Sequence, residues 1–349
     1  MTNILKTKKD KLPLSNTTLL MTITICSFCV MYLLAMLIWG GGFLNPQQFL
    51  DLFNNNAYLI LVACGLTIVM ITGGIDISVG GSIALITMAS VVYMRDHNTG
   101  IVSAALIALG IGLAMGLVQG TLVAYLKIQP FIVTLAGMFF TRGMTTIVSK
   151  EPVTAKNAAF LAIKETHINI PGLERVAKNG NIIPSYIEIG VVIALVVVIL
   201  LWATLKWTRF GRNLYAVGGN SESALMLGIN VQKTQFFAYV LCGLLAGIGG
   251  FVYLLHTGAG NASNATQAEM QAIASSIIGG TLLSGGVGSV IGTLFGVMSL
   301  KTITNIVVAS GLREPYWQSI TTGLMLCFFI LLQSVILASR KKKLGNQAG

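Results

Sequence analysis

The chain has 349 residues, of which 54% are hydrophobic and only 9% are charged. A soluble domain carries about 25% charged residues, because its outer surface must be covered by polar groups. The composition therefore excludes an ordinary soluble protein and indicates a multi-pass protein embedded in the lipid bilayer of the cytoplasmic membrane. The net charge of +11 does not indicate a nucleic-acid partner, because the basic residues flank apolar segments and no soluble domain carries them.

Apolar segments follow one another along the whole chain, and a membrane span needs about 20 such residues. The first of them follows four lysines in residues 1–16 and exceeds the length of about 7–15 apolar residues in a signal peptide, so we expect an uncleaved helix. The sequence predicts an all-α, polytopic transmembrane helical bundle. Its spans, about ten in number, are expected at residues 17–39, 57–72, 77–94, 101–126, 130–148, 187–207, 235–257, 268–284, 286–309 and 316–338.

Lys and Arg gather in three segments, and short loops rich in these residues face the cytoplasm. The segments are the N-terminus at 1–16, the segment 208–234 and the tail at 339–349. An even number of expected spans separates each pair, so we expect all three in the cytoplasm. The loop 149–186 would then be external, although it contains five basic residues of its own. Residues 1–349 form a single transmembrane domain in this interpretation.

Glycines recur at four-residue spacing in two of the expected spans, at Gly112, Gly116 and Gly120 and at Gly288, Gly292 and Gly296. Small residues at this spacing form a helix face that another backbone can approach closely. Ordinary helix packing is one interpretation of the pattern. The other is an inverted repeat of the kind that transporters use.

A glycine-rich segment with one carboxylate joins the second and third expected spans at residues 73–81. A charged residue such as Asp76 costs about 2.5–3.5 kcal/mol at the centre of a membrane. Asp76 or Ser78 could cap the third helix in a hairpin at the cytoplasmic surface. Alternatively, the segment is a broken helix that lines a solute pathway.

A second acidic residue opens the segment 268–288, which is otherwise rich in glycines and hydroxyls. Glu269 would lie in the first turn of a helix, where the helix dipole favours a negative charge. The small residues after it allow either close packing or a cavity.

Other polar residues lie inside the expected spans and are costly in lipid. Gln119 and Asn305 are neutral hydrogen-bonding residues, suited either to sugar hydroxyls or to joining helices. Arg142 and Lys301 either face the interior of the bundle or extend to the interface.

The segment between the sixth and seventh expected spans predicts a short helix that no membrane span requires, capped by Asn220 or Ser221. Its mostly apolar face combines Ala224, Leu225, Leu227 and Gly228. Such a helix lies on lipid or docks on a partner, and the small residues favour the groove of a partner protein.

The sequence gives no sign of catalysis, so we expect no catalytic residue, metal or cofactor. The three histidines have no acidic partner within helical reach, and the absence of Gly-Lys excludes a phosphate-binding loop. A channel would need a selectivity filter or a ring of charges, and neither is present. A solute permease powered by a separate subunit is the remaining interpretation.

Four motifs together resemble the permease subunits of bacterial ABC importers for ribose, galactose, xylose and similar monosaccharides. They are Gly-Gly-Ile-Asp-Ile-Ser-Val-Gly at 73–80, Pro-Phe-Ile-Val-Thr-Leu at 130–135, Gly-Arg-x-x-Tyr-Ala-x-Gly-Gly-Asn at 211–220, and Glu-Met-x-Ala-Ile-Ala with Ile-Gly-Gly-Thr within 269–281. The family has Leu where this chain has Ile77 and Met270, and Asn where it has Gln119. The motifs occur in the family's order, and the resemblance covers nearly the whole chain.

The resemblance implies partners and site residues. Five residues of the segment 208–234 are similar to the loop by which ABC permeases couple to their ATPase subunit: Glu222, Ser223, Ala224, Gly228 and Ile229. It also implies an extracytoplasmic sugar-binding protein opposite the loop 149–186, and a second permease copy or a homologue that completes a dimer.

We expect the translocation pathway of such an importer to include Asp76, Ser78, Gln119, Glu269 and Asn305. Nucleosides and branched-chain amino acids, which relatives of similar architecture carry, are the alternative solutes.

Overall fold

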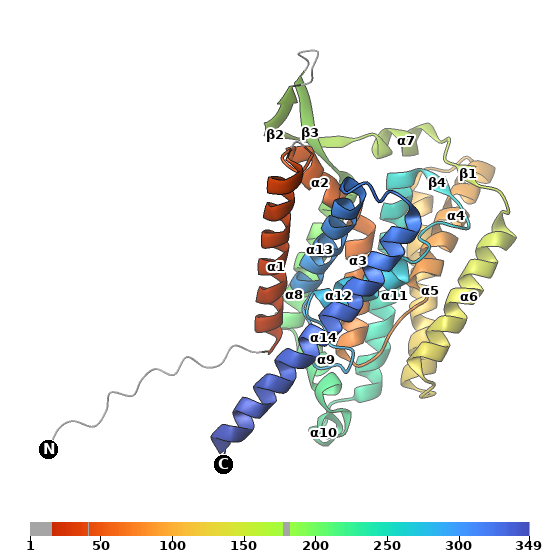
Figure 1. Cartoon of the computed structure of the whole chain (residues 1–349). Helices are drawn as coiled ribbons and strands as arrows, with labels where there is room; N and C mark the ends of the chain where they lie inside the picture. The colour runs from red at the N-terminus through yellow and green to blue at the C-terminus, as the bar shows by residue number, and fades with distance from the viewer. Residues whose placement is uncertain (1–15, 41, 177–181, 349) are drawn as a thin grey trace.

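The computed structural model describes residues 16–40, 42–176 and 182–348, and in these ranges the chain is a bundle of helices (Figure 1). The helices are α1 (Asn16–Trp39), α2 (Pro46–Asn54), α3 (Ala57–Ile71), α4 (Val79–His97), α5 (Ile101–Ala124), α6 (Pro130–Val148), α7 (Ala158–Lys164), α8 (Ile189–Trp207), α9 (Arg209–Gly219), α10 (Ser221–Met226), α11 (Val231–Thr257), α12 (Ala268–Ile278), α13 (Val290–Ala309) and α14 (Pro315–Ala348). The strands are β1 (Val153–Thr154), β2 (His167–Val176), β3 (Ile182–Glu188) and β4 (Ala259–Gly260). Residues 1–15 of the expected N-terminal segment and residue 349 of the tail lie outside the described residues.

Seven of the described helices are long and apolar enough to cross a membrane, namely α1, α5, α6, α8, α11, α13 and α14. The pair α2–α3, bent by 51°, raises the number to eight when it is counted as one span. The expectation of ten spans is therefore confirmed only as seven or eight candidates. The expected span 268–284 is the 11-residue helix α12, which at about 1.5 Å per residue crosses roughly half of a hydrocarbon core.

The two ends of the bundle are built differently. Figure 1 shows the start of α1, the short helix α10 and the end of α14 at one end, and the β2–β3 hairpin, α7, β1 and β4 at the opposite end. The three segments expected on one side of the membrane thus share an end, as far as they are described. The expected external loop 149–186 lies at the other end.

The loop 149–186 contains strands that the all-α expectation missed. Strand β2 pairs antiparallel with β3, and β1 with β4. Helix α2 holds the hairpin, since the Gln47 amide accepts from Tyr186 N at 2.9 Å and Asn54 Oδ1 accepts from Glu188 N at 2.9 Å. The carboxylate of Glu188 also lies 2.8 Å from Nδ1 of His256 on α11. His256 therefore has an acidic partner, which helical spacing alone did not reveal.

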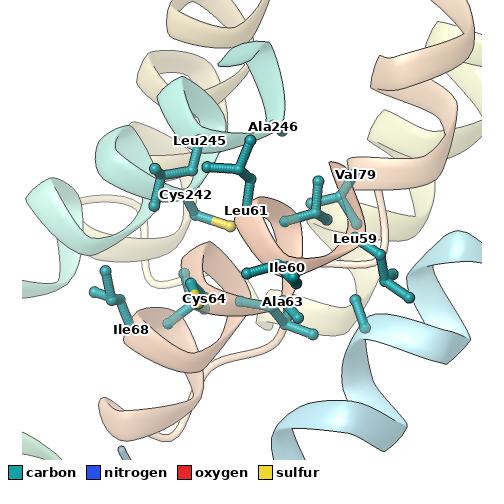
Figure 2. Packing of buried hydrophobic residues seen from close by; sticks show 14 of the residues in the cluster. Leu59, Ile60, Leu61, Ala63, Cys64, Ile68, Val79, Cys242, Leu245 and Ala246 are labelled. Carbon is teal, nitrogen blue, oxygen red and sulfur yellow. The ribbon is translucent and has the colours of Figure 1, made fainter. Parts of the chain in front are cut away.

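Helix α3 lies at the centre of the bundle, in contact with α8, α11, α12 and α13. Every residue of α3 except Tyr58 is buried, as expected for a helix that is apolar all round. Figure 2 shows Cys242, Leu245 and Ala246 of α11 directed toward α3. The buried cysteines Cys64 and Cys242 are free thiols in this packing.

The regularly spaced glycines allow two helix pairs to approach closely. A Cβ on Gly112 of α5 would lie 2.8 Å from the Cα of Gly247 on α11, and a Cβ on Gly243 would lie 2.7 Å from the Cα of Gly116. Gly296 of α13 packs in the same way against α12, where a Cβ would lie 2.9 Å from the backbone nitrogen of Gly279. The glycines thus serve close packing, and the inverted repeat remains a prediction.

The α5–α11 crossing yields a first prediction. Replacing Gly112 by Ala should lower the apparent Tm of the detergent-purified protein, because overpacking at such a contact costs about 1–3 kcal/mol. Gly110 of the same helix has open space around it, so Gly110→Ala should leave the Tm unchanged or raise it slightly. Equal Tm values for the two variants would show that the close approach contributes nothing to stability.

Candidate functional site

The break between α3 and α4 lies in the interior of the chain. Asp76 is 2% exposed, and its Oδ1 accepts from the backbone nitrogen of Ser78 at 2.9 Å and from Ser78 Oγ at 2.7 Å. The thiol of Cys242 on α11 donates to the other carboxylate oxygen at 3.6 Å. Ser78 is the N-cap residue of α4, but its side chain makes no cap bond. The expected cap of this helix by Asp76 or Ser78 is therefore wrong; Asp76 instead forms a local turn that is enclosed by the chain.

The carboxylate of Glu269, in the first turn of α12, lies directly against the start of α4. Glu269 is 9% exposed, and a Cβ on Gly80 would collide with its Oε2. Among the described residues this oxygen has no hydrogen-bond partner. Gly80 is therefore required at this position, because any side chain would displace Glu269 or separate α4 from α12.

Arg142 of α6 fixes the turn that leads into α12. Its guanidinium donates to the carbonyls of Ala262 at 3.0 Å, Asn264 at 2.7 Å and Ala265 at 3.1 Å. This turn needs support, because Ala265 and Gln267 both have positive φ, which is strained for residues with a Cβ. Arg142 thus faces the bundle and does not extend to the interface.

Gln119 of α5 lies close to Ser78. Both contact Gly137 of α6, where a Cβ would lie 2.5 Å from Gln119 Nε2 and 3.3 Å from the Cβ of Ser78. The Nε2 group is buried and has no partner among the described residues. Four of the expected pathway residues, Asp76, Ser78, Gln119 and Glu269, therefore surround the start of α4. Asn305 on α13 is half-buried and belongs to none of these contacts.

The segment 208–234 forms two helices and a defined turn. Asn220 caps α10 by accepting from Ser223 N at 2.8 Å, which decides between the two expected caps. At the other end of α10, Gly228 has a φ of +78°, while the nitrogens of Gly228 and Ile229 donate to the carbonyls of Leu225 and Ala224. These two bonds make a Schellman motif, for which a glycine at the left-handed position is favoured.

The exposed face of α10 differs from the one expected. Ala224 is buried against the chain itself, whereas Leu225, Met226 and Leu227 are 64%, 88% and 79% exposed. Of the expected apolar face, Leu225 and Leu227 are thus exposed, whereas Ala224 packs into the chain and Met226 is exposed in addition. Glu222 and Ser223 are exposed on the same helix.

A groove of about 780 Å³ lies beside α10, between residues 123–130 and the turn at Gly228. The α5–α6 turn contributes Lys127 and Ile128, and the start of α11 contributes Val231 and Gln232. No sequence pattern connects the two turns, which are about 100 residues apart in the chain. A partner that binds in this groove beside α10 would therefore also contact the α5–α6 turn.

Helix α9 connects this end of the chain to the interior breaks. Its Tyr215 hydroxyl donates to the carbonyl of Gly288 at 2.9 Å, and a Cβ on Gly218 would lie 2.6 Å from the nitrogen of Gly286. Gly286 N in turn donates to the carbonyl of Ile71, the last residue of α3, at 2.9 Å. Helix α9 is therefore in contact with the α12–α13 connection, which is itself bonded to the end of α3.

Comparisons with known proteins give a consistent result. Residues 48–330 match the family described as branched-chain amino acid transport system / permease component. The chain is 37% identical to the inner membrane ABC transporter permease protein YjfF of Escherichia coli, over 84% of this chain and 85% of the relative. It is 33% identical to the fructose import permease protein FruG of Bifidobacterium longum, over 88% and 90% of the two chains.

A further relative is the ribose import permease protein RbsC of Escherichia coli, 31% identical over 84% of this chain and 87% of its own length. No solved structure matches this chain.

The guanidinium of Arg142 generates the second prediction. Replacing Arg142 by Gln should destabilise the protein by about 2–4 kcal/mol, because each hydrogen bond from a charged group contributes about 1.5–3 kcal/mol and the three bonds are not additive. The apparent Tm of the purified protein measures this loss.

Arg95 supplies the control, because it forms an exposed pair with Asp96 and such pairs contribute little. Arg95→Gln should leave the Tm unchanged. If the two variants are equally stable, other contacts hold the turn before α12.

Proposed function

Because the chain belongs to the family of ABC transporter permease components, we propose that it forms the membrane pathway of an ATP-driven importer for a neutral monosaccharide. The carrying observation is the 31–33% identity to permeases named for fructose and ribose import over 84–88% of this chain. It is a multi-pass membrane protein that performs no reaction itself, so a partner subunit hydrolyses ATP.

The orientation of the chain follows from its charges. Lys206, Arg209, Arg212 and Lys233 lie around α9 and α10, and basic residues in short connections favour the cytoplasm. The end that carries α10 is therefore the cytoplasmic one, with the start of α1 and the end of α14 beside it. Counting α3, α4, and α12 together with its connection to α13, as three further crossings beside the seven long spans gives ten, which returns the chain to the cytoplasm.

In this proposal the ATPase subunit binds to α10. Leu225, Met226 and Leu227 provide exposed apolar side chains on a helix whose two ends are fixed by Asn220 and Gly228. A helix with fixed ends transmits a displacement to the segments that it contacts, whereas a flexible loop would change its own conformation instead. The displacement reaches the α3–α4 and α12–α13 connections through the contacts of α9, and it reaches α11 through the turn at Gly228. The helices then rock between outward- and inward-open states.

An extracytoplasmic sugar-binding protein docks at the opposite end, on the β2–β3 hairpin. The hairpin is held by side chains of α2 and by the Glu188–His256 pair, so it is positioned relative to α11. A second permease copy or a homologue completes the pathway.

Reconstituted transport tests the proposal. The permease is assembled with its ATPase subunit and binding protein in proteoliposomes, and uptake of labelled ribose, galactose and fructose is measured with ATP inside. We expect ATP-dependent uptake of at least one sugar, without competition from leucine or a nucleoside. ATP-dependent uptake of leucine or a nucleoside instead of sugar would overturn the choice of solute, and uptake without ATP would overturn the importer.

The third prediction concerns the turn at Gly228. Gly228→Arg should abolish uptake while membrane insertion persists, because Arg adds a bulky charge and strains the left-handed backbone that closes α10. Gly228→Asn is the control, since Asn tolerates this conformation and should keep most of the uptake. Normal uptake by the Arg variant would exclude a coupling role for this turn.

The fourth prediction concerns the apolar face of α10. Met226→Glu should weaken co-purification of the ATPase subunit by about tenfold, because a buried methionine contributes about 1.5–3 kcal/mol to such a contact. Leu312→Glu places the same charge on an exposed residue in the connection after α13, at the end of the bundle away from α10, and should leave co-purification unchanged. Equal losses for both variants would point to a general defect and not to a contact of α10.

A further inference from the structure

A groove of about 580 Å³ lies between α12 and the first part of α14. Its volume is within the range of about 300–1,000 Å³ that is usual for small-molecule sites. The residues that give it a polar lining are Gln267, Gln271, Gln318, Ser319 and Thr322. Because α14 begins at the end of the bundle that carries the hairpin (Figure 1), the groove belongs to the outer half of the protein in the proposed orientation.

The two faces of α14 differ in chemistry. Ile320, Leu324 and Phe328 follow one another at four-residue spacing, and all three are exposed. The polar residues Gln318 and Thr322 share the opposite face, because two residues along a helix correspond to a rotation of about 200°. The apolar face is suited to lipid or to another helix. The amide and hydroxyl face is costly in lipid, so it must face water, solute or protein.

The glutamine amides of the groove are oriented by their neighbours. Lys301 Nζ donates to Gln271 Oε1 at 2.6 Å, and since an ammonium group can only donate, it fixes which end of the amide it meets. Ser319 Oγ donates to Gln267 Oε1 at 3.0 Å. Both amide oxygens are thus engaged, and the NH₂ groups remain to donate to a ligand.

The lining selects a class of ligand. Among the residues that the structure describes, the lining contains no carboxylate and no cation. Lys301, which bonds to Gln271, is not one of the lining residues. Amide donors together with the hydroxyls of Ser319 and Thr322 complement hydroxyl groups that both donate and accept. Tyr316 and Met270 add apolar surface at the edge, which can cover the carbon face of a sugar ring.

We propose that this groove forms the outer part of the solute path and binds sugar hydroxyls through Gln267, Gln271 and Gln318, an inference that rests on the proposed import of a neutral sugar. Asp76, Gln119 and Glu269 surround the buried start of α4 instead. Their role in this scheme is to hold the α4–α12 contact that positions the groove.

Two tryptophan variants of α14 test the groove in the reconstituted complex of permease, ATPase and binding protein. Thr322→Trp fills the groove and should reduce sugar uptake by about tenfold or more, while ATP hydrolysis is still stimulated by the loaded binding protein. Leu324→Trp places the same bulk on the apolar face two residues away, where a membrane environment accepts it, and should leave uptake unchanged.

A second set of variants removes polar groups without adding bulk. Thr321 and Thr322 both bond their hydroxyl to the carbonyl four residues before, at 2.7 and 2.8 Å, but only Thr322 lines the groove. Thr322→Val combined with Gln318→Leu should lower uptake at subsaturating loaded binding protein by about threefold to tenfold. Thr321→Val should not.

The outcomes separate the groove from the proposed function. If the unaltered complex imports no sugar, the proposed function fails whatever the variants do. If it imports sugar and Thr322→Trp performs like Leu324→Trp, only the groove proposal is overturned. The groove proposal is also overturned if Thr322→Trp prevents the complex from assembling, because the face would then be a contact between subunits, or if stimulation of ATP hydrolysis is lost together with uptake.

Discussion

The structure depends on a constraint set by the bilayer: a backbone group that leaves a helix inside the membrane must find its partner within the protein. The chain interrupts its helices with irregular backbone before α4, before α12 and before α13. Each break is supported by specific bonds. At the first, Asp76 accepts from the backbone nitrogen of Ser78, and at the second the guanidinium of Arg142 donates to backbone carbonyls. At the third, the backbone nitrogen of Gly286 donates to the carbonyl of Ile71. Each break is thus bonded within the protein, as the bilayer requires.

These supports place the breaks in contact with each other and with the cytoplasmic segment. The carbonyl at the end of α3 meets the connection between α12 and α13, and α9 packs on that connection through Tyr215 and Gly218. Irregular backbone has fewer internal bonds than a helix and changes conformation at lower cost. The contacts of α9 therefore connect the α10 end of the chain to this irregular backbone, and in the proposed mechanism this is where the bundle changes shape.

Helix α11 connects the two ends of the molecule. It begins at the turn after Gly228, its centre packs on α3, α4 and α5, and His256 near its end pairs with Glu188 of the hairpin. A binding protein at one end and an ATPase at the other would therefore act on the same helix. The neutral lining of the groove between α12 and α14 is consistent with cargo that carries no charge, since a charged solute would need a fixed counter-charge along its way.

The sequence by itself determined the properties that follow from local composition and spacing. Apolar runs predicted a membrane protein and the positions of its long helices, and basic clusters predicted which segments share an end. Asn220, one of the two expected caps, marked the start of α10. Four motifs, which occur in the same order as in the permease family, identified that family. These features are readable because each depends on residues that are neighbours in the chain.

Only the tertiary structure decided how distant segments meet. It enclosed Asp76, shortened the expected span 268–284 to α12, turned Ala224 inward, paired Glu188 with His256 across 68 residues, and set Gln271 opposite Gln318. None of these follows from periodicity, because burial and pairing are determined by which helices become neighbours. That choice rests on the close approach of glycine faces and on the need to bond every interrupted backbone, and both are properties of the packed chain as a whole.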